Sequence, residues 1–335
     1  MVSKRWAERR QMVRAAYLYY EAGLNQSEVA KRIGLSRPLI SKLLQKARET
    51  GIVEISIKDD TIVTTQLEEQ LTNAFGLAEA IVIPVQEGWD DEEVKRQMAK
   101  TAGILLKKRI TRSKTVGVSW GTTLYHFVQE FPFVQAKHLR ILPLIGGMGR
   151  NYGQLHSNQL AKQLADKLSA TCEHLYVPAI LSSENLKEQL LDSMDIRALL
   201  HEATRVDVAI VGLGSPYAST MTQLGYLKES DLESLMKFGA VGDINSRFID
   251  ENGEEVADPI NERVIGIDVE DMRSIATVVC MVTGKGKAKA LLAALHGGYI
   301  DILVVDSETA AAVLRLKEGG GRVVRGDQSD GDVLY

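Results

Sequence analysis

Residues 25–51, NQSEVAKRIGLSRPLISKLLQKARETG, decide the fold of the first part of this 335-residue chain. Asn25 stands three residues before Glu28, the spacing of a capping box at the start of a helix, and Gly34 is placed to end that helix. Ser36 then stands where it can cap a second helix. Two short helices joined by a tight turn predict a helix-turn-helix, whose second helix lies in the major groove of DNA.

The two predicted helices each have an inward and an outward face. The inward positions, at helical spacing, are apolar: Val29, Ala30, Ile33, Ile40, Leu43, Leu44 and Ala47. The outward positions of the second helix carry groups that bond to base edges and phosphates: Arg37, Ser41, Lys42, Gln45 and Lys46. Gln26, in the first turn of the preceding helix, is placed to meet a phosphate near the positive end of the helix dipole. Operator DNA is therefore the expected partner, and the alternative is a plain three-helix bundle with a polar surface.

A further helix is expected before this motif and a short strand after it. Helical spacing upstream is carried by four residues, Val13, Ala16, Tyr17 and Tyr20. Gly23 is placed to end that upstream helix. Residues 53–57 alternate between apolar and polar side chains, which is typical of a strand and would form a small wing. Together these elements predict a winged-helix-like domain over residues 1–58.

Charge is divided unevenly along the chain. The formal net charge is −4, yet residues 1–58 hold 12 Lys and Arg against 5 Asp and Glu, a balance of +7 that leaves −11 for the remainder. A basic head on an acidic body is typical of a polyanion-binding module joined to a separate sensor or enzyme, although a charged run is as readily a solvated face.

The composition excludes several classes of protein. Hydrophobic residues make up 45% of the chain and charged residues 25%, as in ordinary globular domains, and no run approaches the roughly 20 apolar residues of a membrane-spanning helix. The basic N-terminus has no apolar stretch behind it, so we expect no secretory signal and a cytoplasmic protein. Cys172 and Cys280 are too few for a metal signature, and we expect core thiols rather than a redox pair.

Strands alternate with helices beyond residue 58. The apolar runs expected as buried strands are residues 80–84, 115–119, 139–145, 206–211, 277–282 and 300–305. Helical periodicity covers residues 64–75, 157–168, 288–296 and 308–316. This alternation predicts an α/β, Rossmann-like domain with a mostly parallel sheet and helices on both faces. We expect the domain to span residues 59–318 and a polar tail to follow over residues 319–335.

Four glycine-rich turns follow predicted strands, at residues 121–123, 146–149, 212–214 and 284–287. In such sheets ligands bind beyond the carboxyl ends of the strands, so a pocket is expected at these turns. The first turn opens a helix, so the backbone at Gly121 and the hydroxyls of Thr122 and Thr123 can converge on an anion. Lys287 adds a positive charge to the last turn. Any one of these turns is more readily explained as a simple chain reversal, but four together favour a phosphate-binding pocket.

No nucleotide-binding motif is complete. The Gly286-Lys287 pair lacks the first glycine of a Walker A sequence and is followed by Ala288. The pair Gly212 and Gly214 lacks the third glycine of a dinucleotide-binding turn. We therefore expect no cofactor, neither NAD nor ATP, and no metal.

Several segments match the pattern of one known family. They are YYEAGLNQSEVAKRIGLSRPLISKLLQKARETGIVEISI near the N-terminus and, in the body, VGVSWGTTLYHF, LIGG, HSNQLA, AVGDINSRF and VTGKGKAKALLAALHGGYIDILVVD. On these segments the chain resembles the SorC family of sugar-responsive transcriptional regulators. The resemblance implies a DNA-binding regulator controlled by a sugar-derived, phosphorylated effector. It also implies that residues 59–318 bind the effector and form a homodimer or homotetramer, with no membrane partner.

The same resemblance assigns roles to residues of the body. Thr122, Thr123 and Lys287 would hold the phosphate, and Asp243 would accept hydrogen bonds from sugar hydroxyls. The other residues implied in the effector pocket are Gly121, Gly146, Gly147, Asn158, Gly212 and Gly214. The alternatives are that Asp243 is a turn or capping aspartate and that Asn158 caps the start of a helix.

One departure from the family pattern bears on the effector. Some relatives place Lys or Arg immediately before the second glycine turn, where this chain has Ile145. Isoleucine neither forms a Schiff base with an open-chain sugar nor pairs with a phosphate. This argues against a covalently held deoxyribose phosphate. Arg150 either supplies a charge instead or is a surface residue.

A sugar-phosphate isomerase or deaminase is the rival interpretation, because such enzymes resemble the same kind of body. Its acid and base would be sought among Asp243, Asp268 and His156. No recognisable catalytic motif fixes any pair of them, and a sugar enzyme does not need a recognition helix. We therefore expect no enzymatic activity.

Overall fold

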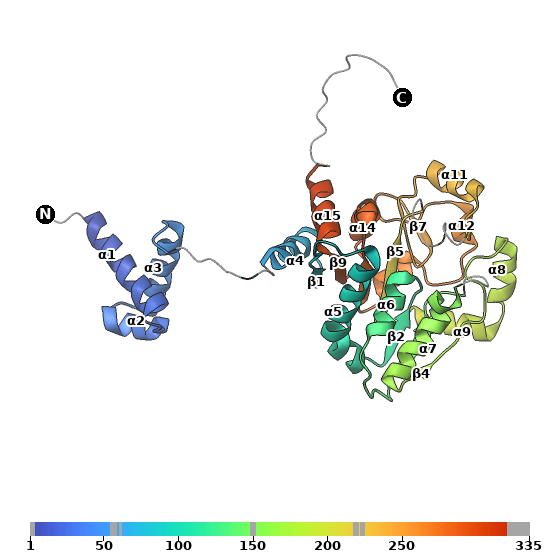
Figure 1. Ribbon diagram of the computed structural model, residues 1–335, viewed down its shortest axis with the longest axis horizontal. Coiled ribbons are helices and arrows are strands. Elements are labelled where there is room, and N and C mark those ends of the chain that lie inside the picture. Colours follow the sequence, from blue (N-terminus) through green and yellow to red (C-terminus); the bar gives the residue numbers. More distant parts are fainter. Residues whose placement is uncertain are drawn as a thin grey trace, which may run out of the picture. The chain divides into compact units, whose positions relative to one another are not determined.

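The computed structural model describes residues 4–53, 59, 62–147, 152–216, 221 and 225–319. The chain forms two compact units, residues 1–62 and 63–335 (Figure 1). The described elements of the first unit are all helical: α1 Lys4–Ala16, η1 Tyr17–Glu21, α2 Gln26–Ile33 and α3 Arg37–Glu49. Residues 54–57 of the predicted wing strand lie outside the described residues.

The predicted start and end of α2 are confirmed by its capping contacts. The Asn25 side chain accepts hydrogen bonds from the backbone N–H groups of Ser27 and Glu28 at 3.0 and 3.1 Å. The Glu28 carboxylate accepts one from the Asn25 backbone N–H at 2.8 Å, which completes the capping box. Gly34 ends α2 with a φ of 79°, a left-handed conformation that favours glycine. The tight turn into α3 follows directly.

The capping role predicted for Ser36 is wrong. Ser36 stands at the N-cap position of α3, but its side chain makes no capping hydrogen bond. Pro38 in the first turn has no N–H to donate. The next N–H, that of Leu39, bonds instead to the backbone carbonyl of Ser36 at 3.0 Å. The fixed φ of Pro38, rather than a side-chain cap, therefore prepares the first turn of α3.

The four residues whose helical spacing predicted the upstream helix do not form its buried face. Only Ala16 among them is buried, whereas Val13 and Tyr17 are 47% and 62% exposed. The buried stripe runs through Met12 and Ala15 instead, at the i, i+3 spacing of one helical face. The π-helical turn η1 then follows, with the Ala22 N–H bonding to the Tyr17 carbonyl at 3.0 Å. This wider turn breaks the 3.6-residue period on which the prediction through Tyr20 relied.

The described elements of the second unit alternate between strands and helices. The strands are β1 Glu79–Ile83, β2 Thr115–Val118, β3 Arg140–Pro143, β4 Thr171–Cys172, β5 Val208–Gly214, β6 Gly242–Ile244, β7 Arg247–Ile249, β8 Val278–Val282 and β9 Ile302–Asp306. The longer helices are α4 Ile62–Phe75, α5 Asp91–Arg112, α6 Thr122–Glu130, α7 Ser157–Leu168, α8 Glu184–Leu191, α9 Met194–Ala203, α11 Glu229–Lys237, α14 Ala288–His296 and α15 Ser307–Gly319. Short helical segments are η2 Gly153–Leu155, α12 Pro259–Glu262, α13 Val269–Ser274 and η3 Lys285–Lys287. No helix of the described part is both long and apolar enough to cross a membrane.

The strands form one nine-stranded sheet with the order β1-β9-β8-β5-β2-β3-β4, and a hairpin of β6 and β7 branches from β5. Every pair along the main path is parallel, as the alternation of strands and helices predicts. All six predicted strands are present within a few residues of their expected bounds. Arg150 and residues 320–335 of the predicted tail lie outside the described residues, and α15 ends at Gly319.

Both faces of the sheet are buried under helices, as expected for a doubly wound α/β fold. Along β1, Ala80 and Val82 pack into one core and Ile81 and Ile83 into the other. The first core also contains residues of α4, α13, α14 and α15, and the second contains residues of α5, α6 and α7. Figure 1 shows α5, α6 and α7 lying side by side over one face of the strands.

The sheet has a switch point between β2 and β5. From β2 the chain continues outward to β3 and β4, whereas from β5 it continues in the opposite direction to β8 and β9. The loops that follow β2 and β5 therefore diverge to opposite sides and leave a crevice at the carboxyl ends of these strands. A ligand site is expected in that crevice.

Both cysteines are free thiols in the sheet. Cys280 of β8 is fully buried, and burial raises the pKa of its thiol to about 12. Cys172 of β4 is partly buried, and burial raises the pKa of its thiol to about 11. At these values neither thiol is ionised near neutral pH, as the prediction of core thiols requires.

Candidate functional site

A cavity of about 380 Å³ opens at this switch point. It is lined by the loop after β2, the end of β5, the loop after β8, the hairpin strand β6 and the first turns of α5. The lining residues are Asp91, Glu92, Lys95, Ser119, Trp120, Gly121, Thr122, Thr123, Gly212, Leu213, Gly214, Met221, Asp243, Asn245, Thr283, Gly284, Gly286 and Lys287. Among the described residues no group of His, Cys, Asp and Glu is arranged to hold a metal ion.

Helix α6 directs its N-terminus into the cavity. Gly121 precedes it with a φ of 119°, a conformation that side-chain-bearing residues rarely adopt. No side chain in the described part of the chain caps this helix, and Thr122 and Thr123 lie in its first turn. Thr123 is buried, while Thr122 is half-buried at the cavity wall. Backbone N–H groups at the positive end of a helix together with two hydroxyls form an anion-binding arrangement.

The loop after β8 brings a lysine to the same cavity. Gly284 has a φ of 102°, and its N–H donates to Asp306 Oδ2 at 2.9 Å. The Asp306 carboxylate is itself buried and also accepts the backbone N–H and hydroxyl of Thr309, so the loop is held firmly. The described residues offer the ammonium group of Lys287 no hydrogen bond or ion pair. Burial lowers the pKa of Lys287, and the nearby carboxylate of Asp243 raises it in part.

Asp243 on β6 is a buried carboxylate that faces the cavity. The residue is 6% exposed, and its Oδ1 atom has no hydrogen-bond partner among the described residues. Burial raises the pKa of Asp243 to about 7, against the opposing effects of Lys287 and the backbone N–H of Ser246. A Cβ at Gly214, opposite Asp243 in the β5–β6 pairing, would lie 2.1 Å from Oδ1. Gly214 therefore makes room for the carboxylate beside the end of β5.

The β6–β7 hairpin is fixed to the sheet by its two turn residues. Asn245 and Ser246 both have positive φ, 51° and 60°, as a tight two-residue hairpin turn requires. The Asn245 side chain accepts a hydrogen bond from Ser119 Oγ at 2.7 Å, and Trp120 Nε1 donates to Ser246 Oγ at 2.9 Å. The hairpin that carries Asp243 is thus bonded to the loop that opens α6.

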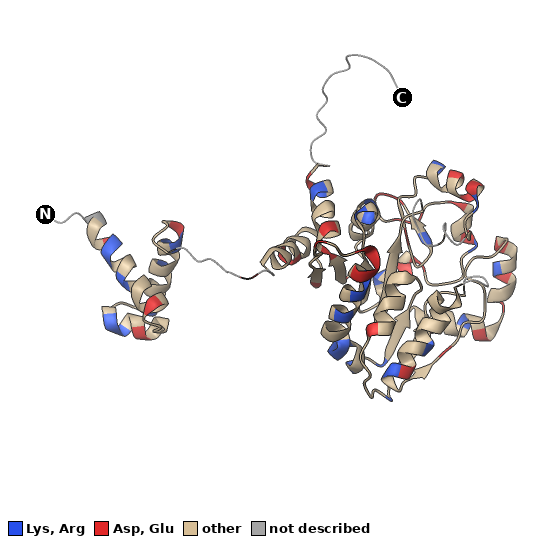
Figure 2. Cartoon of the chain, viewed as in Figure 1, with Lys and Arg blue, Asp and Glu red and all other residues tan. Residues whose placement is uncertain are grey.

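The exposed face of α3 carries the residues predicted to contact DNA. Figure 2 colours the Lys and Arg positions of α2 and α3 blue. Exposed residues of α3 include Arg37, Ser41, Lys42, Gln45 and Lys46, whereas Gln26 at the start of α2 is half-buried. The inward face is formed by Ile40, Leu44 and Ala47, all buried, and by the partly buried Leu43. Gln45 Nε2 donates to Glu49 Oε1 at 2.9 Å and is in this way held along the helix.

Comparison with known proteins extends over both units. The Sugar-bind family model, which describes a sugar-binding domain, matches residues 59–315, and a winged helix-turn-helix DNA-binding model matches residues 16–54. The sorbitol operon regulator of Klebsiella pneumoniae is 31% identical over 91% of this chain and 98% of its own length. The chain belongs to the SorC family.

Other SorC-family proteins and structures agree with this assignment. The deoxyribonucleoside regulator of Bacillus subtilis is 28% identical over 90% of this chain and 96% of its own length. A DeoR family transcriptional regulator from Listeria monocytogenes is 42% identical, has a TM-score of 0.71 and covers 75% of this chain and 99% of its own. The crystal structure of the full-length K. pneumoniae regulator also has a TM-score of 0.71 over 91% of this chain. With its helix-turn-helix and its sugar-binding domain, the chain is a transcriptional regulator.

Seven of the ten effector-site residues predicted for this SorC-family chain line the cavity. They are Gly121, Thr122, Thr123, Gly212, Gly214, Asp243 and Lys287. The other three, Gly146, Gly147 and Asn158, do not. The Asn158 amide is occupied by both backbone groups of Leu175, at 2.8 Å each, so it ties α7 to the strand β4 region. Gly147 lines a separate cavity of about 240 Å³ together with Pro178 and Arg263.

Gly146 and the residue before it, Ile145, are packed against other parts of the domain. A Cβ at Gly146 would lie 2.5 Å from the Val177 carbonyl oxygen, so this glycine permits close backbone packing. Ile145, immediately before this glycine turn, is fully buried in a cluster with Trp120 and Phe248.

The N-terminal turns of α5 contribute three cavity residues that the sequence did not predict: Asp91, Glu92 and Lys95. In the sequence, the acidic residues here look like the acidic first turn that many helices have, so they gave no sign of a ligand site. A topological signal existed, however. Because α5 follows β1, its N-terminus must lie at the carboxyl edge of a parallel sheet, where the ligand crevice is.

Proposed function

We propose that this regulator binds a phosphorylated sugar in the cavity and operator DNA through α3. The observation that carries the proposal is the convergence in one cavity of three features that have no partner among the described residues: the N-terminus of α6, the ammonium of Lys287 and the Oδ1 atom of Asp243. The first two suit a phosphate, held by Thr122, Thr123 and Lys287. The third suits a hydroxyl donor, and the ring would lie along Gly212 and Gly214.

On the DNA side, the proposal rests on α2 and α3. Their capping box, tight turn and buried inner stripe present a rigid, exposed outer face. Arg37, Lys42 and Lys46 would contact phosphates or guanine edges, and Ser41 and Gln45 would contact bases. Gln26 would contact a phosphate at the start of α2.

Control of DNA binding would work by population shift. An effector changes the arrangement of the two units only if it binds one arrangement more tightly than another. Because operator half-sites repeat at intervals of about 34 Å, paired recognition helices require at least a dimer. We propose that residues 59–318 form that dimer or a tetramer, that residues 1–58 bind DNA, and that the protein acts in the cytoplasm, where the operator is.

Of the three residues sought for the enzymatic alternative, Asp243 lines the cavity and the other two do not. A sugar-phosphate isomerase needs a positioned acid and base near the sugar carbons. Neither His156 nor Asp268 lines the cavity, and Asp268 caps α13 by accepting the Asp271 N–H at 2.7 Å. We therefore propose a regulator without turnover of its effector, which incubation with candidate phosphosugars and product analysis would check.

A thermal-shift screen of the full chain tests the effector class. Phosphorylated sugars and their free counterparts are compared in pairs, with the variant Lys287→Ala beside the wild type. A ligand at about 100 times its Kd should raise the melting temperature of the sugar-binding domain by about 5–10 °C. We expect that rise for at least one phosphosugar, a much smaller rise for its free sugar, and little for Lys287→Ala. An equal response to both members of a pair would rule out the phosphate assignment.

A further inference from the structure

We propose that Lys95 is a second phosphate-binding cation of the cavity. In the absence of effector its ammonium group is paired with the Glu92 carboxylate, and the effector phosphate displaces that carboxylate. The proposal rests on the proposed function, because it assigns a regulatory competitor to the same phosphate site. Neither residue was among those that the sequence had implicated in effector binding. Both come from the first turns of α5 and both line the cavity.

The side chains of Lys95 and Glu92 differ in how far they are exposed to solvent. Lys95 Nζ donates to Glu92 Oε1 at 2.7 Å, but the Lys95 side chain is only 17% exposed while that of Glu92 is 62% exposed. The lysine is therefore held in the wall of the cavity, and the carboxylate beside it is the more exposed partner. An anion entering the cavity can approach the same ammonium group from within.

Glu92 keeps a second partner when it gives up Lys95. His126 Nε2 lies 2.9 Å from Glu92 Oε2, so the two carboxylate oxygens contact different groups. Glu92 also lies in the first turn of α5, where the helix dipole favours a negative charge. The pair with Lys95 is solvent-exposed on one side and thus contributes little by itself. Breaking the Glu92–Lys95 ion pair therefore costs little free energy when a phosphate takes the place of the carboxylate.

The charges of the cavity favour a second cation for the phosphate. Lys287 is the first cation, and Lys95 is close enough that its charge adds to burial in lowering the pKa of Lys287. Two ammonium groups that repel each other are both satisfied by one phosphate dianion, which has several acceptor oxygens. Glu92, with a single negative charge and a second partner in His126, compensates them only in part.

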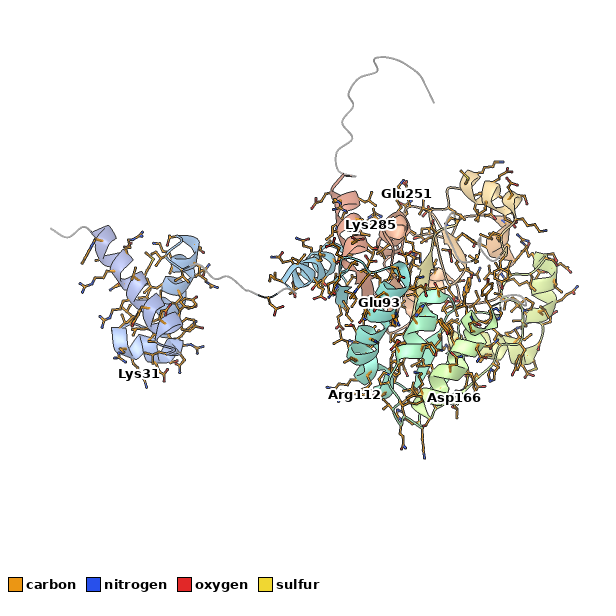
Figure 3. All side chains as sticks on the ribbon, in the orientation of Figure 1. Lys31, Glu93, Arg112, Asp166, Glu251 and Lys285 are labelled. Carbon is orange, nitrogen blue, oxygen red and sulfur yellow. The ribbon has the colours of Figure 1, made fainter. Side chains whose placement is uncertain are left out.

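The same helix supplies a matched control. Glu93 pairs with Arg96 at the same i, i+3 spacing as Glu92 with Lys95, one residue further along α5. Neither Glu93 nor Arg96 lines the cavity. Glu93, labelled in Figure 3, lies on α5, whose first turns are acidic in Figure 2. Glu93→Gln therefore makes the same change in net charge as Glu92→Gln without touching the site.

Equilibrium dialysis with radiolabelled inorganic phosphate, at constant ionic strength and with the full chain, tests the proposal. Glu92→Gln removes the competitor and should tighten phosphate binding by about two- to fivefold, the range expected from an exposed ion pair. Lys95→Met removes a charge-assisted contact and should weaken binding about tenfold, while Lys95→Arg should retain most of it. Glu93→Gln should bind phosphate as the wild type does. Thermal unfolding of each variant confirms that it is folded.

The outcomes distinguish a failure of this proposal from a failure of the proposed phosphate site. If the wild type binds phosphate and Lys287→Ala does not, but Glu92→Gln binds no more tightly than Glu93→Gln, the competitor role is wrong and the phosphate site stands. Unchanged binding by Lys95→Met would likewise overturn the role of Lys95. If the wild type itself holds no phosphate, the phosphate site of the proposed function fails, and this inference fails with it.

Discussion

Asp243 shows how far a single residue could be understood from the sequence. Its place in the segment AVGDINSRF predicted a ligand contact, and the structure places it in the cavity wall. Its pKa was not predictable, because that depends on burial beside Gly214 and on the charge of Lys287, residues distant in sequence. Asn158 illustrates the reverse case. Its amide type fitted a pocket, but only the fold reveals that Leu175 occupies it.

The pKa of Asp243 leads to a prediction of pH dependence. Because burial raises this pKa to about 7, the carboxylate that accepts a hydroxyl hydrogen bond is the minor form at pH 6 and the major form at pH 8. The affinity for the effector, relative to that of Asp243→Asn, should therefore rise about tenfold from pH 6 to pH 8. Calorimetric titration of both proteins at each pH measures this ratio, and the variant cancels the titration of the ligand phosphate. A ratio that stays flat or falls would contradict the assigned role.

Helices and strands followed from local patterns wherever those patterns were regular. The capping box at Asn25, the inner stripe of α3 and the parallel strands of the body were all predictable. The face of α1 was not, because the π-helical turn η1 interrupts the helical period. The β6–β7 hairpin was also missed, since its three-residue strands are too short to show alternation.

The two N-cap positions of the helix-turn-helix should respond differently to substitution. Asn25→Ala removes both side-chain capping bonds of α2 and should destabilise that helix by about 1 kcal/mol. Ser36→Ala removes a side chain that caps nothing and should change stability little. Hydrogen exchange of the full chain measures both, with faster exchange of the α2 amides expected for Asn25→Ala alone and unchanged exchange in the sheet. Equal effects of the two substitutions would disagree with the capping assignment.

At the scale of the whole molecule, the charge asymmetry of the sequence corresponds to two separate units. The basic residues 1–58 contain the exposed face of α3, and the cavity belongs to the acidic remainder. Membership of the SorC family joins the two as output and sensor. The helix that completes the sensor site, α5, has no motif of its own in the sequence, and only the topology of the sheet brings its N-terminus to the cavity.

The division of labour between the units is tested most directly by two variants in two assays. Lys42→Ala and Lys287→Ala are compared with the wild type for binding to a duplex enriched from random-sequence DNA and to the phosphosugar that stabilises the chain most. Lys42→Ala should lose about tenfold in DNA affinity and keep its effector affinity. Lys287→Ala should lose about tenfold or more in effector affinity and bind DNA normally in the absence of effector. Matching losses by each variant in both assays would contradict a DNA-binding head controlled by a separate phosphosugar site.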